Sequence, residues 1–199
     1  LIKTGYERET EGTTDEFGQV SGGVAPGFKQ YVPGVEAATR FTGIYDDPRF
    51  ITEDQNIIEG GFVIADTSFF KVFDRPILYG NPVEVLSRRL SVMVSRSFAE
   101  KLGGIDNAIG KIITPTQETK VPFTIEGVFE DFPRNSTINV DVLLSMVTYS
   151  KWSSENWIGN DRYFGFVKLE QGVDPESLSD AIHKMQEANQ NLEELEENG

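Results

Sequence analysis

The chain has 199 residues, of which 38% are hydrophobic and 11% aromatic, so it is long enough to build a hydrophobic core without disulfides or metals. Its formal net charge of −14 disfavours nucleic acid and anionic lipid as partners, because both are bound through Lys and Arg. The absence of cysteine excludes disulfides, thiolate zinc sites and cysteine nucleophiles. No apolar run reaches the roughly 20 residues of a membrane helix. Since the chain starts at Leu1 rather than at Met, we expect a soluble fragment of a longer protein.

The first 44 residues predict a strand, a helix and a second strand. Residues 2–8 carry Ile and Tyr among charged neighbours, as an edge strand does, and residues 12–23 are rich in Gly, Thr and Ser, which predicts a loop. A helix is predicted to begin at Val24, with Pro26 in its first turn, where the missing amide of proline costs nothing. A strand then follows within residues 35–44.

Two acidic turns follow at residues 46–47 and 53–54. Clustered carboxylates suit a hard cation such as Ca²⁺. However, the spacing contains no Asp-x-Asp-x-Asp-Gly series of the EF-hand kind. A solvated hairpin is therefore the preferred interpretation.

Residues 62–82 predict a buried strand, one helical turn and a bend. Asp66 or Thr67 is placed to cap the turn. Three rings at helical spacing predict one aromatic face in the core, while a proline ends the turn and a Gly-Asn-Pro bend follows. These residues are Phe69, Phe70, Phe73, Pro76 and Gly80.

Residues 90–129 predict a strand, a short helix and a hairpin. Apolar and polar residues alternate over 90–95, which is typical of a half-buried strand. Ser95 then caps a helix that ends at Gly103 and Gly104. The alternation over 121–129 predicts a strand paired with the short strand 111–113.

Residues 131–169 predict a polar loop, a strand over 140–146, a second loop and a central strand over 162–169. Asp131 and Arg134 in the first loop could form a functional pair, but hydrogen bonds that fix the turn are the preferred interpretation. Trp152 and Trp157 lie in the second loop, where indoles either form a binding surface or anchor the loop on its own core.

The C-terminal element is a predicted helix that Asp174 caps and that runs to Leu192. His183 falls outside its apolar stripe, so we expect neither a metal ligand nor a catalytic base there. Residues 193–197 are acidic and load the helix end unfavourably, so we expect this end to fray.

The order of strands and helices indicates an α+β fold with a mixed or antiparallel sheet. No Gly-rich phosphate loop, Gly-x-Ser-x-Gly elbow or His-Glu-x-x-His helix occurs in the sequence. Carboxylates are abundant in so acidic a chain, so their number is poor evidence for a glycosidase pair. We nevertheless predict a protein that is not an enzyme and that needs no cofactor or metal.

The order and spacing of several motifs resemble the MacB-like periplasmic core domain of ABC transporter permeases of the MacB/FtsX type. The first motif is the aromatic turn and its bend, formed by Asp66, Phe69, Phe70, Phe73, Pro76 and Gly80. The second is the strand start at Gly110, and the third is the loop with Asp131, Pro133, Asn135 and Ser136. Leu102 and Thr137 depart from the family, which often has Phe and His there.

The resemblance implies a fold and a function. It implies an α/β, porter-like lobe over residues 1–85 and 139–199, with a smaller β-rich lobe inserted at 86–138. It further implies an extracytoplasmic domain between two membrane helices, on the periplasmic side of a bacterial inner membrane, with both termini leaving one face. Its partners would be those helices, an ABC ATPase and a periplasmic adaptor or outer-membrane component, but not nucleic acid.

Two other hypotheses remain open from the residues. An independent extracytoplasmic domain could bind sugar or peptide on Trp152 and Trp157. A small hydrolase is the third and weakest interpretation.

Overall fold

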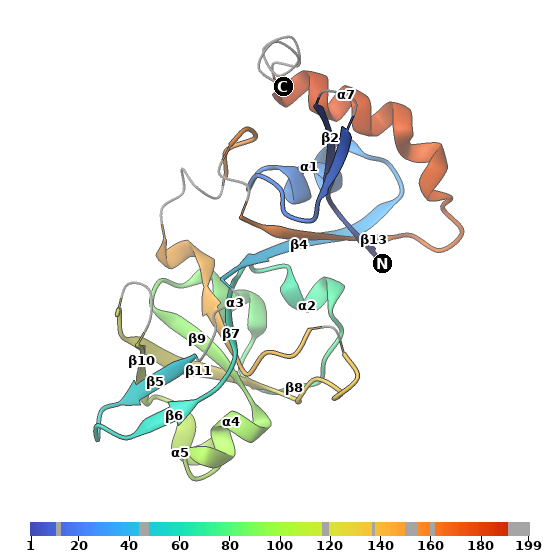
Figure 1. Cartoon of the computed structure of the whole chain (residues 1–199). Helices are drawn as coiled ribbons and strands as arrows, with labels where there is room; N and C mark the ends of the chain where they lie inside the picture. The colour runs from blue at the N-terminus through green and yellow to red at the C-terminus, as the bar shows by residue number, and fades with distance from the viewer. Residues whose placement is uncertain are drawn as a thin grey trace. The chain divides into compact units, whose positions relative to one another are not determined.

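The computed structural model describes residues 1–10, 13–43, 48–116, 120–136, 138–149, 155–159 and 162–190. The chain divides into a terminal unit, Leu1–Phe41 with Ser150–Gly199, and a central unit, Thr42–Tyr149 (Figure 1). Both described ends of the chain therefore belong to the terminal unit. Among the described residues, no helix has the length and hydropathy needed to cross a bilayer.

The terminal unit contains a three-stranded antiparallel sheet in the order β1 (Ile2–Lys3), β13 (Phe164–Leu169), β4 (Val35–Thr42). One face packs against α1 (Val24–Tyr31), η2 (Pro175–Leu178) and α7 (Ser179–Asn189). The core between them contains Val32, Val35, Ala38, Val167, Leu178 and Met185. The other face carries the stacked rings of Phe41, Phe164 and Phe166, so β13 bears apolar residues on both faces, as predicted.

A second, two-stranded sheet in the terminal unit corrects the prediction for its first residues. β2 (Tyr6–Thr10) pairs with β3 (Thr13–Phe17), although a single strand over 2–8 and a loop over 12–23 were expected. The rings of Tyr6 and Phe17 stack with centroids 4.8 Å apart. Such a cross-strand aromatic pair stabilises a hairpin whose intervening residues are mostly polar.

The central unit is built on a mixed sheet whose strands run in the order β7, β12, β9, β11, β10, β5, β6, with β8 pairing β11 to one side. β12 is parallel to β7, β11 is parallel to β9, and the other pairs are antiparallel. The strands are β5 (Arg49–Thr52), β6 (Ile57–Glu59), β7 (Phe62–Ala65), β8 (Ile77–Tyr79), β9 (Ser91–Ser95), β10 (Ile112–Pro115), β11 (Phe123–Phe129) and β12 (Val142–Ser145).

Among the described residues, α2 (Phe69–Val72), α3 (Pro82–Ser87), α4 (Arg96–Lys101) and α5 (Ile105–Ala108) lie between these strands, and η1 (Met146–Thr148) follows β12. Ser95 caps α4 as predicted, because its hydroxyl accepts a hydrogen bond from the Phe98 amide at 3.1 Å. α3 was not predicted. The Gly-Asn-Pro sequence predicts a bend, but it contains the cap Asn81 and the first residue Pro82, and both residue types also start helices.

Three further expectations need correction. β9 is buried at all five positions rather than on one face; α3 and α4 contact its side chains, while β11 and β12 only pair with its main chain in the sheet. Asp66 does not cap α2; its carboxylate accepts from the amide and hydroxyl of Ser68, which forms a turn before the helix. The observed central unit is also wider than the expected lobe 86–138, because β7 and β12 lie in the same sheet as β9.

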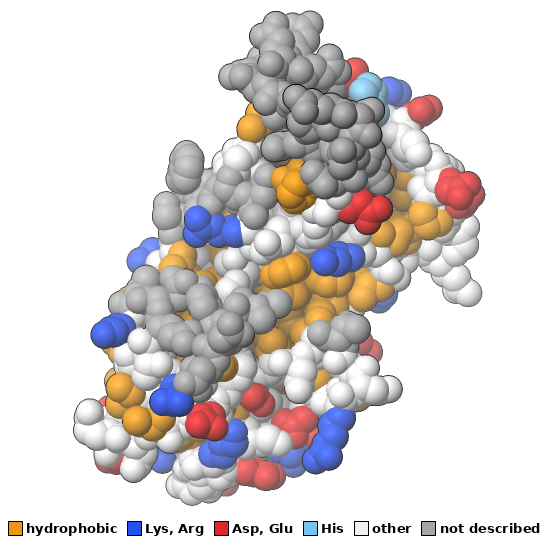
Figure 2. Space-filling model, in the orientation of Figure 1, with side chains coloured by type: hydrophobic (Ala, Val, Ile, Leu, Met, Phe, Trp, Pro, Cys, Tyr) orange, Lys and Arg blue, Asp and Glu red, His pale blue; other side chains and the backbone are white. Residues whose placement is uncertain are grey.

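The α+β class with a mixed sheet is confirmed. On the face drawn in Figure 2, acidic and basic side chains are interspersed over the central unit, and neither sign forms one large patch. The expectation that both termini leave one face depends on residues 191–199, which lie outside the described residues.

Candidate functional site

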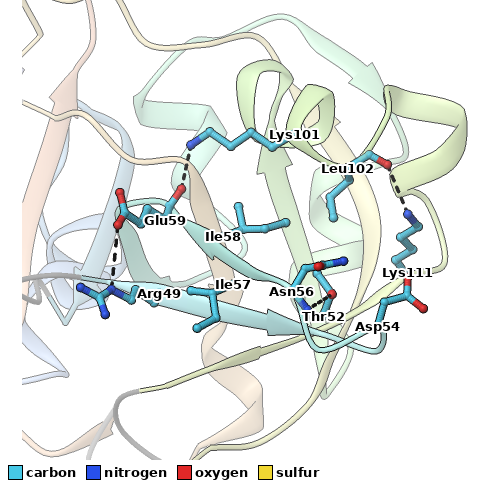
Figure 3. Close-up of a pocket in the computed structure, with 10 residues that line it drawn as sticks. All are labelled: Arg49, Thr52, Asp54, Asn56, Ile57, Ile58, Glu59, Lys101, Leu102 and Lys111. Atoms are coloured by element: carbon cyan, nitrogen blue, oxygen red, sulfur yellow. Dashed lines mark hydrogen bonds and ion pairs between the residues drawn. The ribbon is translucent and has the colours of Figure 1, made fainter.

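The central unit contains an open groove of about 860 Å³ (Figure 3). The β5–β6 hairpin forms one wall, and the end of α4 with the start of β10 forms the other. Its lining consists of Arg49, Thr52, Asp54, Asn56, Ile57, Ile58, Glu59, Lys101, Leu102 and Lys111.

Basic side chains span this groove and bind mainly to the main chain. Lys101 Nζ donates to the Glu59 carbonyl at 2.7 Å, and Lys111 Nζ donates to the Leu102 carbonyl at 3.2 Å (Figure 3). Arg49 lies 4.0 Å from the Glu59 carboxylate, in a loose pair that is largely solvent-exposed. The groove therefore presents ammonium and guanidinium groups beside an exposed sheet edge, an arrangement suited to binding an anionic group.

Sequence reasoning did not find this groove. Its basic residues are far apart in the sequence and come from different elements, so no local motif marks them. Of the acidic turns, residues 46–47 lie outside the described residues, and Glu53 accepts a hydrogen bond from the Ile112 amide at 3.4 Å. Within the described residues, no cluster of three or more His, Asp or Glu is placed to hold a metal ion.

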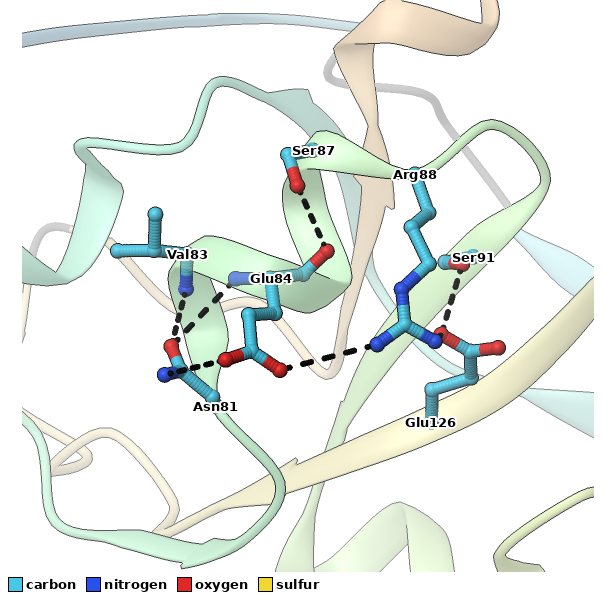
Figure 4. A network of polar contacts seen from close by, with 7 residues as sticks. All are labelled: Asn81, Val83, Glu84, Ser87, Arg88, Ser91 and Glu126. Atoms are coloured by element: carbon cyan, nitrogen blue, oxygen red, sulfur yellow. Dashed lines mark hydrogen bonds and ion pairs between the residues drawn. The ribbon is translucent and has the colours of Figure 1, made fainter.

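A polar network links α3 to β9 and β11 (Figure 4). Asn81 caps α3 by accepting from the amides of Val83 and Glu84, and its side-chain amide donates back to the Glu84 carboxylate. Arg88 then bridges Glu84, at 3.8 Å, and Glu126, at 3.0 Å. These contacts hold the turn between α3 and β9 in place.

A second network lies at the start of α4 and contains Asp131 of the predicted loop. Arg96 forms a two-pronged ion pair with Glu130, with a shortest distance of 2.8 Å. Its hydrogen bond to Arg96 lowers the pKa of the Glu130 carboxyl, and the same contact raises the pKa of Arg96. Asp131 accepts from the amide and hydroxyl of Ser97 at 3.0 and 2.6 Å.

Asp131 is held ionised by these contacts. Burial alone would raise the pKa of Asp131, but hydrogen bonds from Ser97 and Ser95 and the charge of Arg96 outweigh it and lower the pKa below its ordinary value. The partner of Asp131 is therefore the start of α4 rather than Arg134, which is exposed. This supports the structural interpretation of the loop.

The aromatic turn has the predicted position, but its three rings are unequally buried. Phe69 is fully buried, Phe73 is 9% exposed and Phe70 is only partly buried. Phe70 packs against Phe129 of β11, with centroids 5.4 Å apart. Pro76 is exposed, and its carbonyl accepts from the Glu130 amide at 2.9 Å.

Gly80 and Gly110 both have the positive φ that favours glycine, at +79° and +82°. At Gly80 a Cβ would also lie 2.5 Å from the Glu126 carbonyl oxygen, whereas nothing lies within 4 Å at Gly110. Gly80 is thus needed for close approach to β11, and Gly110 only for its backbone angle.

The remaining motif residues shape an exposed turn. Pro133 and Asn135 are exposed, and the Ser136 amide donates to the Pro133 carbonyl at 2.8 Å. Ser136 Oγ accepts from the Ile138 amide at 3.2 Å. The glycine, proline and polar motif residues thus form local structure and are not gathered into one cavity.

Trp157 anchors its loop on the terminal unit. A Cβ at Gly23 or Gly27 would overlap its ring, which therefore lies against α1, and its edge meets Tyr31 with centroids 6.4 Å apart. Its carbonyl accepts from the Gln190 side chain at 2.8 Å. Trp152 lies outside the described residues. His183 is exposed and lies 3.2 Å from Glu187, one helical turn away.

Sequence reasoning also missed Asp141, which joins three segments. Its carboxylate accepts from the Gly61 amide at 3.0 Å and from the Ser95 hydroxyl at 3.2 Å, and its carbonyl accepts from the Ser95 amide at 2.7 Å. A single aspartate before a strand carries no sequence signal for contacts so distant along the chain.

Comparison with known proteins agrees with the resemblance seen in the motifs. The family model of the MacB-like periplasmic core domain matches residues 4–185. The chain is similar to a crystal structure of a domain of a protein assigned as a permease in Porphyromonas gingivalis. The identity is 40% and the TM-score 0.80, covering 89% of this chain and 81% of the other. No curated protein sequence matches the chain.

Two more distant structures share the fold. The periplasmic region of MacB from Actinobacillus actinomycetemcomitans is 13% identical with a TM-score of 0.59, covering 86% of this chain and 76% of that one. The extracellular domain of the transporter YknZ from Gram-positive bacteria is 14% identical with a TM-score of 0.54, covering 83% of each. Since the family model spans nearly the whole chain, this chain belongs to the family of MacB-like periplasmic core domains.

Proposed function

We propose that this chain is the extracytoplasmic domain of an ABC transporter permease and that it transmits movement of the adjoining membrane helices to the periplasmic side. The helices would be moved by an ATPase in a separate domain or subunit. The observation that supports this most is the family match over residues 4–185, together with the 40% identity to a domain assigned to a permease. Export of a substrate and contact with an adaptor or outer-membrane component belong to the same proposal.

The division of the chain supports a coupling role. Both described ends belong to the terminal unit, and the central unit is formed by one continuous stretch, Thr42–Tyr149. Flanking membrane helices would then pull on the terminal unit, and the central unit would follow through its two connections. Movement between the two units is therefore the expected signature of coupling.

Distance measurements in the intact permease with its ATPase test this. The chain has no cysteine, so spin labels can be attached to cysteines introduced at chosen sites. Glu176→Cys in the terminal unit and Asp106→Cys in the central unit are both exposed positions. We expect the distance distribution of this pair, measured by double electron–electron resonance, to change between nucleotide-free and ATP-bound states.

The control pair is Lys71→Cys with Asp106→Cys, both exposed within the central unit. Its distance should stay constant between the two states. Identical distributions for the cross-unit pair in both nucleotide states would contradict the coupling proposal.

We also propose that the domain is not an enzyme. Several carboxylates near the family motifs have structural partners: Glu126 pairs with Arg88, Glu130 with Arg96, and Asp131 with Ser97. We expect the purified chain to hydrolyse neither ATP nor ester or glycoside reporters. Turnover that disappears on replacement of a single carboxylate would overturn this.

The alternative of a sugar- or peptide-binding domain built on tryptophans has less support. The ring of Trp157 already lies against α1 and Tyr31, so it is poorly placed to stack on a ligand.

A further inference from the structure

We propose that the groove between β6 and α4 binds an extended, carboxylate-bearing segment of a partner protein, laid along the free edge of β6. This inference stands on the groove itself and goes beyond the coupling role proposed above. All groove residues lie within residues 4–185, which the family model matches, but none of them is among the motif residues named above except Leu102, as a departure.

The first step is that β6 ends the sheet of the central unit. It pairs with β5 on one side, and among the described residues no strand pairs with its other side. The Thr52 amide donates to the Asn56 carbonyl and the Gly60 amide donates to the Pro48 carbonyl. Because hydrogen-bonded pairs alternate in an antiparallel ladder, Ile58 faces β5, while the main-chain groups of Ile57 and Glu59 point to the free edge.

This edge is exposed and partly protected. The side chain of Ile57 is 63% exposed. Lys101 covers the outward Glu59 carbonyl at 2.7 Å, and a lysine at a sheet edge is a common device against indiscriminate strand pairing. The amide and carbonyl of Ile57 and the amide of Glu59 remain for an added strand, which would exchange two hydrogen bonds with Ile57.

The charges of the groove select the partner. Its lining contains three basic side chains, Arg49, Lys101 and Lys111, and two acidic ones, in a chain whose formal net charge is −14. The hydrogen-bond partners of the two lysines are main-chain carbonyls, which carry only partial charge. A carboxylate would form a stronger, charge-assisted hydrogen bond with the same ammonium groups.

The acidic remainder of the protein does not prevent this. At about 0.15 M salt the Debye length is about 8 Å, so the charges of distant carboxylates are largely screened, while contacts inside the groove are not. An approaching acidic strand would thus be attracted by Lys101 and Lys111. Lys101, which otherwise protects the edge, would then contact an acidic residue of that strand.

The test is a titration of the isotope-labelled chain, at about 0.15 M salt, with a short blocked peptide in which glutamate and valine alternate. Alternation places the carboxylates on one face of an extended strand. We expect the amide resonances of Ile57 and Glu59 to shift more than that of Ile58, because only the former face the free edge. A peptide with glutamine in place of glutamate should bind at least tenfold more weakly.

Matched variants identify the groups responsible. The double variant Lys101→Gln with Lys111→Gln should weaken binding of the glutamate peptide at least tenfold. Lys71→Gln with Lys184→Gln makes the same change of charge on exposed lysines that do not line the groove, and it should leave the affinity unchanged. Thermal unfolding of each variant checks that the fold is retained.

Three results would overturn the proposal. Equal binding of the glutamate and glutamine peptides would show that charge does not select the ligand. Equal binding of a peptide methylated on the nitrogens that face β6 would exclude strand addition. Shifts of the Ile57 amide that depend on protein concentration without peptide would show that a second copy of the chain takes the edge instead.

Discussion

The central and terminal units differ in how they are packed and in what they carry. Among the described residues, the largest fully buried side chains lie in the central unit, with the exception of Met185 in α7. They are Phe50, Phe69, Leu86, Met93, Phe98, Ile113, Phe123, Ile125, Phe129, Leu143 and Leu144. The terminal unit instead has a narrow sheet covered by helices on one face.

The two units also differ in which features of the chain they contain. The motif residues that resemble the family, from Asp66 to Ser136, all lie in the central unit, as does the groove beside β6. The terminal unit contains both described ends. We infer that the central unit is the more stable body and that the terminal unit, with its smaller core, is the one that adapts to its surroundings.

Emptying the core of the central unit should have the largest effect. Phe69→Ala removes a fully buried ring that meets Phe70, Phe73 and Phe132, and we expect a loss of about 3–5 kcal/mol in the free energy of unfolding. Urea denaturation measures it. Val83→Ala, at a site 43% exposed, should change stability little. Similar losses for both variants would contradict the assignment of this core.

Alanine variants of two glycines in the central unit distinguish the cost of a positive φ from the cost of steric overlap. Gly80→Ala combines a positive φ with a Cβ that meets the Glu126 carbonyl at 2.5 Å, so we expect a loss of about 2–3 kcal/mol. Gly110→Ala has the positive φ but open space around it, so about 1 kcal/mol is expected. Equal losses in denaturant titrations would show that close approach to β11 does not matter.

Gly27→Ala tests whether the terminal unit can be destabilised without destabilising the central unit. The new methyl group would overlap the ring of Trp157, which should cost about 1–3 kcal/mol. The fluorescence of Trp157, followed in a Trp152→Phe background, should report unfolding at lower denaturant than in the parent. Hydrogen exchange of β9 amides in the central unit should stay unchanged. Equal destabilisation of both units would show that they unfold as one.

The smallest expected effect concerns Asp131 at the start of α4. Its pKa is lowered in the folded state, so its contribution is present above the pH range in which the unfolded carboxyl titrates, about 3.9, and is lost as pH falls through the lowered value. Because the side chain is partly exposed, Asp131→Asn should cost about 1 kcal/mol at neutral pH.

The gap between the parent and Asp131→Asn should close in acid. Thermal unfolding between about pH 7 and pH 3 measures it, and Asp106→Asn, at an exposed position on α5, is the control. A gap that stays constant over this range would indicate that Asp131 does not act through its charge.

Sequence alone predicted the elements whose signals are local. Ser95 before α4, Asp174 before η2 and the pair Gly103–Gly104 act through contacts with residues a few positions away, so their roles follow from the chain order. The alternation of β11 likewise predicted its buried face. The ordered motifs, from Asp66 to Ser136, also pointed to the family that the comparisons show.

Tertiary structure decided what depends on distant partners. β9 is buried at every position because α3 and α4, which come from segments before and after it, contact its side chains. The β2–β3 hairpin follows from strand pairing, and the division of the chain into two units follows from how contacts between segments cluster; composition reveals neither. The groove arises in the same way. Lys101 reaches the edge of β6, and Lys111 lines the same groove, only once the sheet has formed. Burial and pairing are properties of the folded chain and not of any local segment.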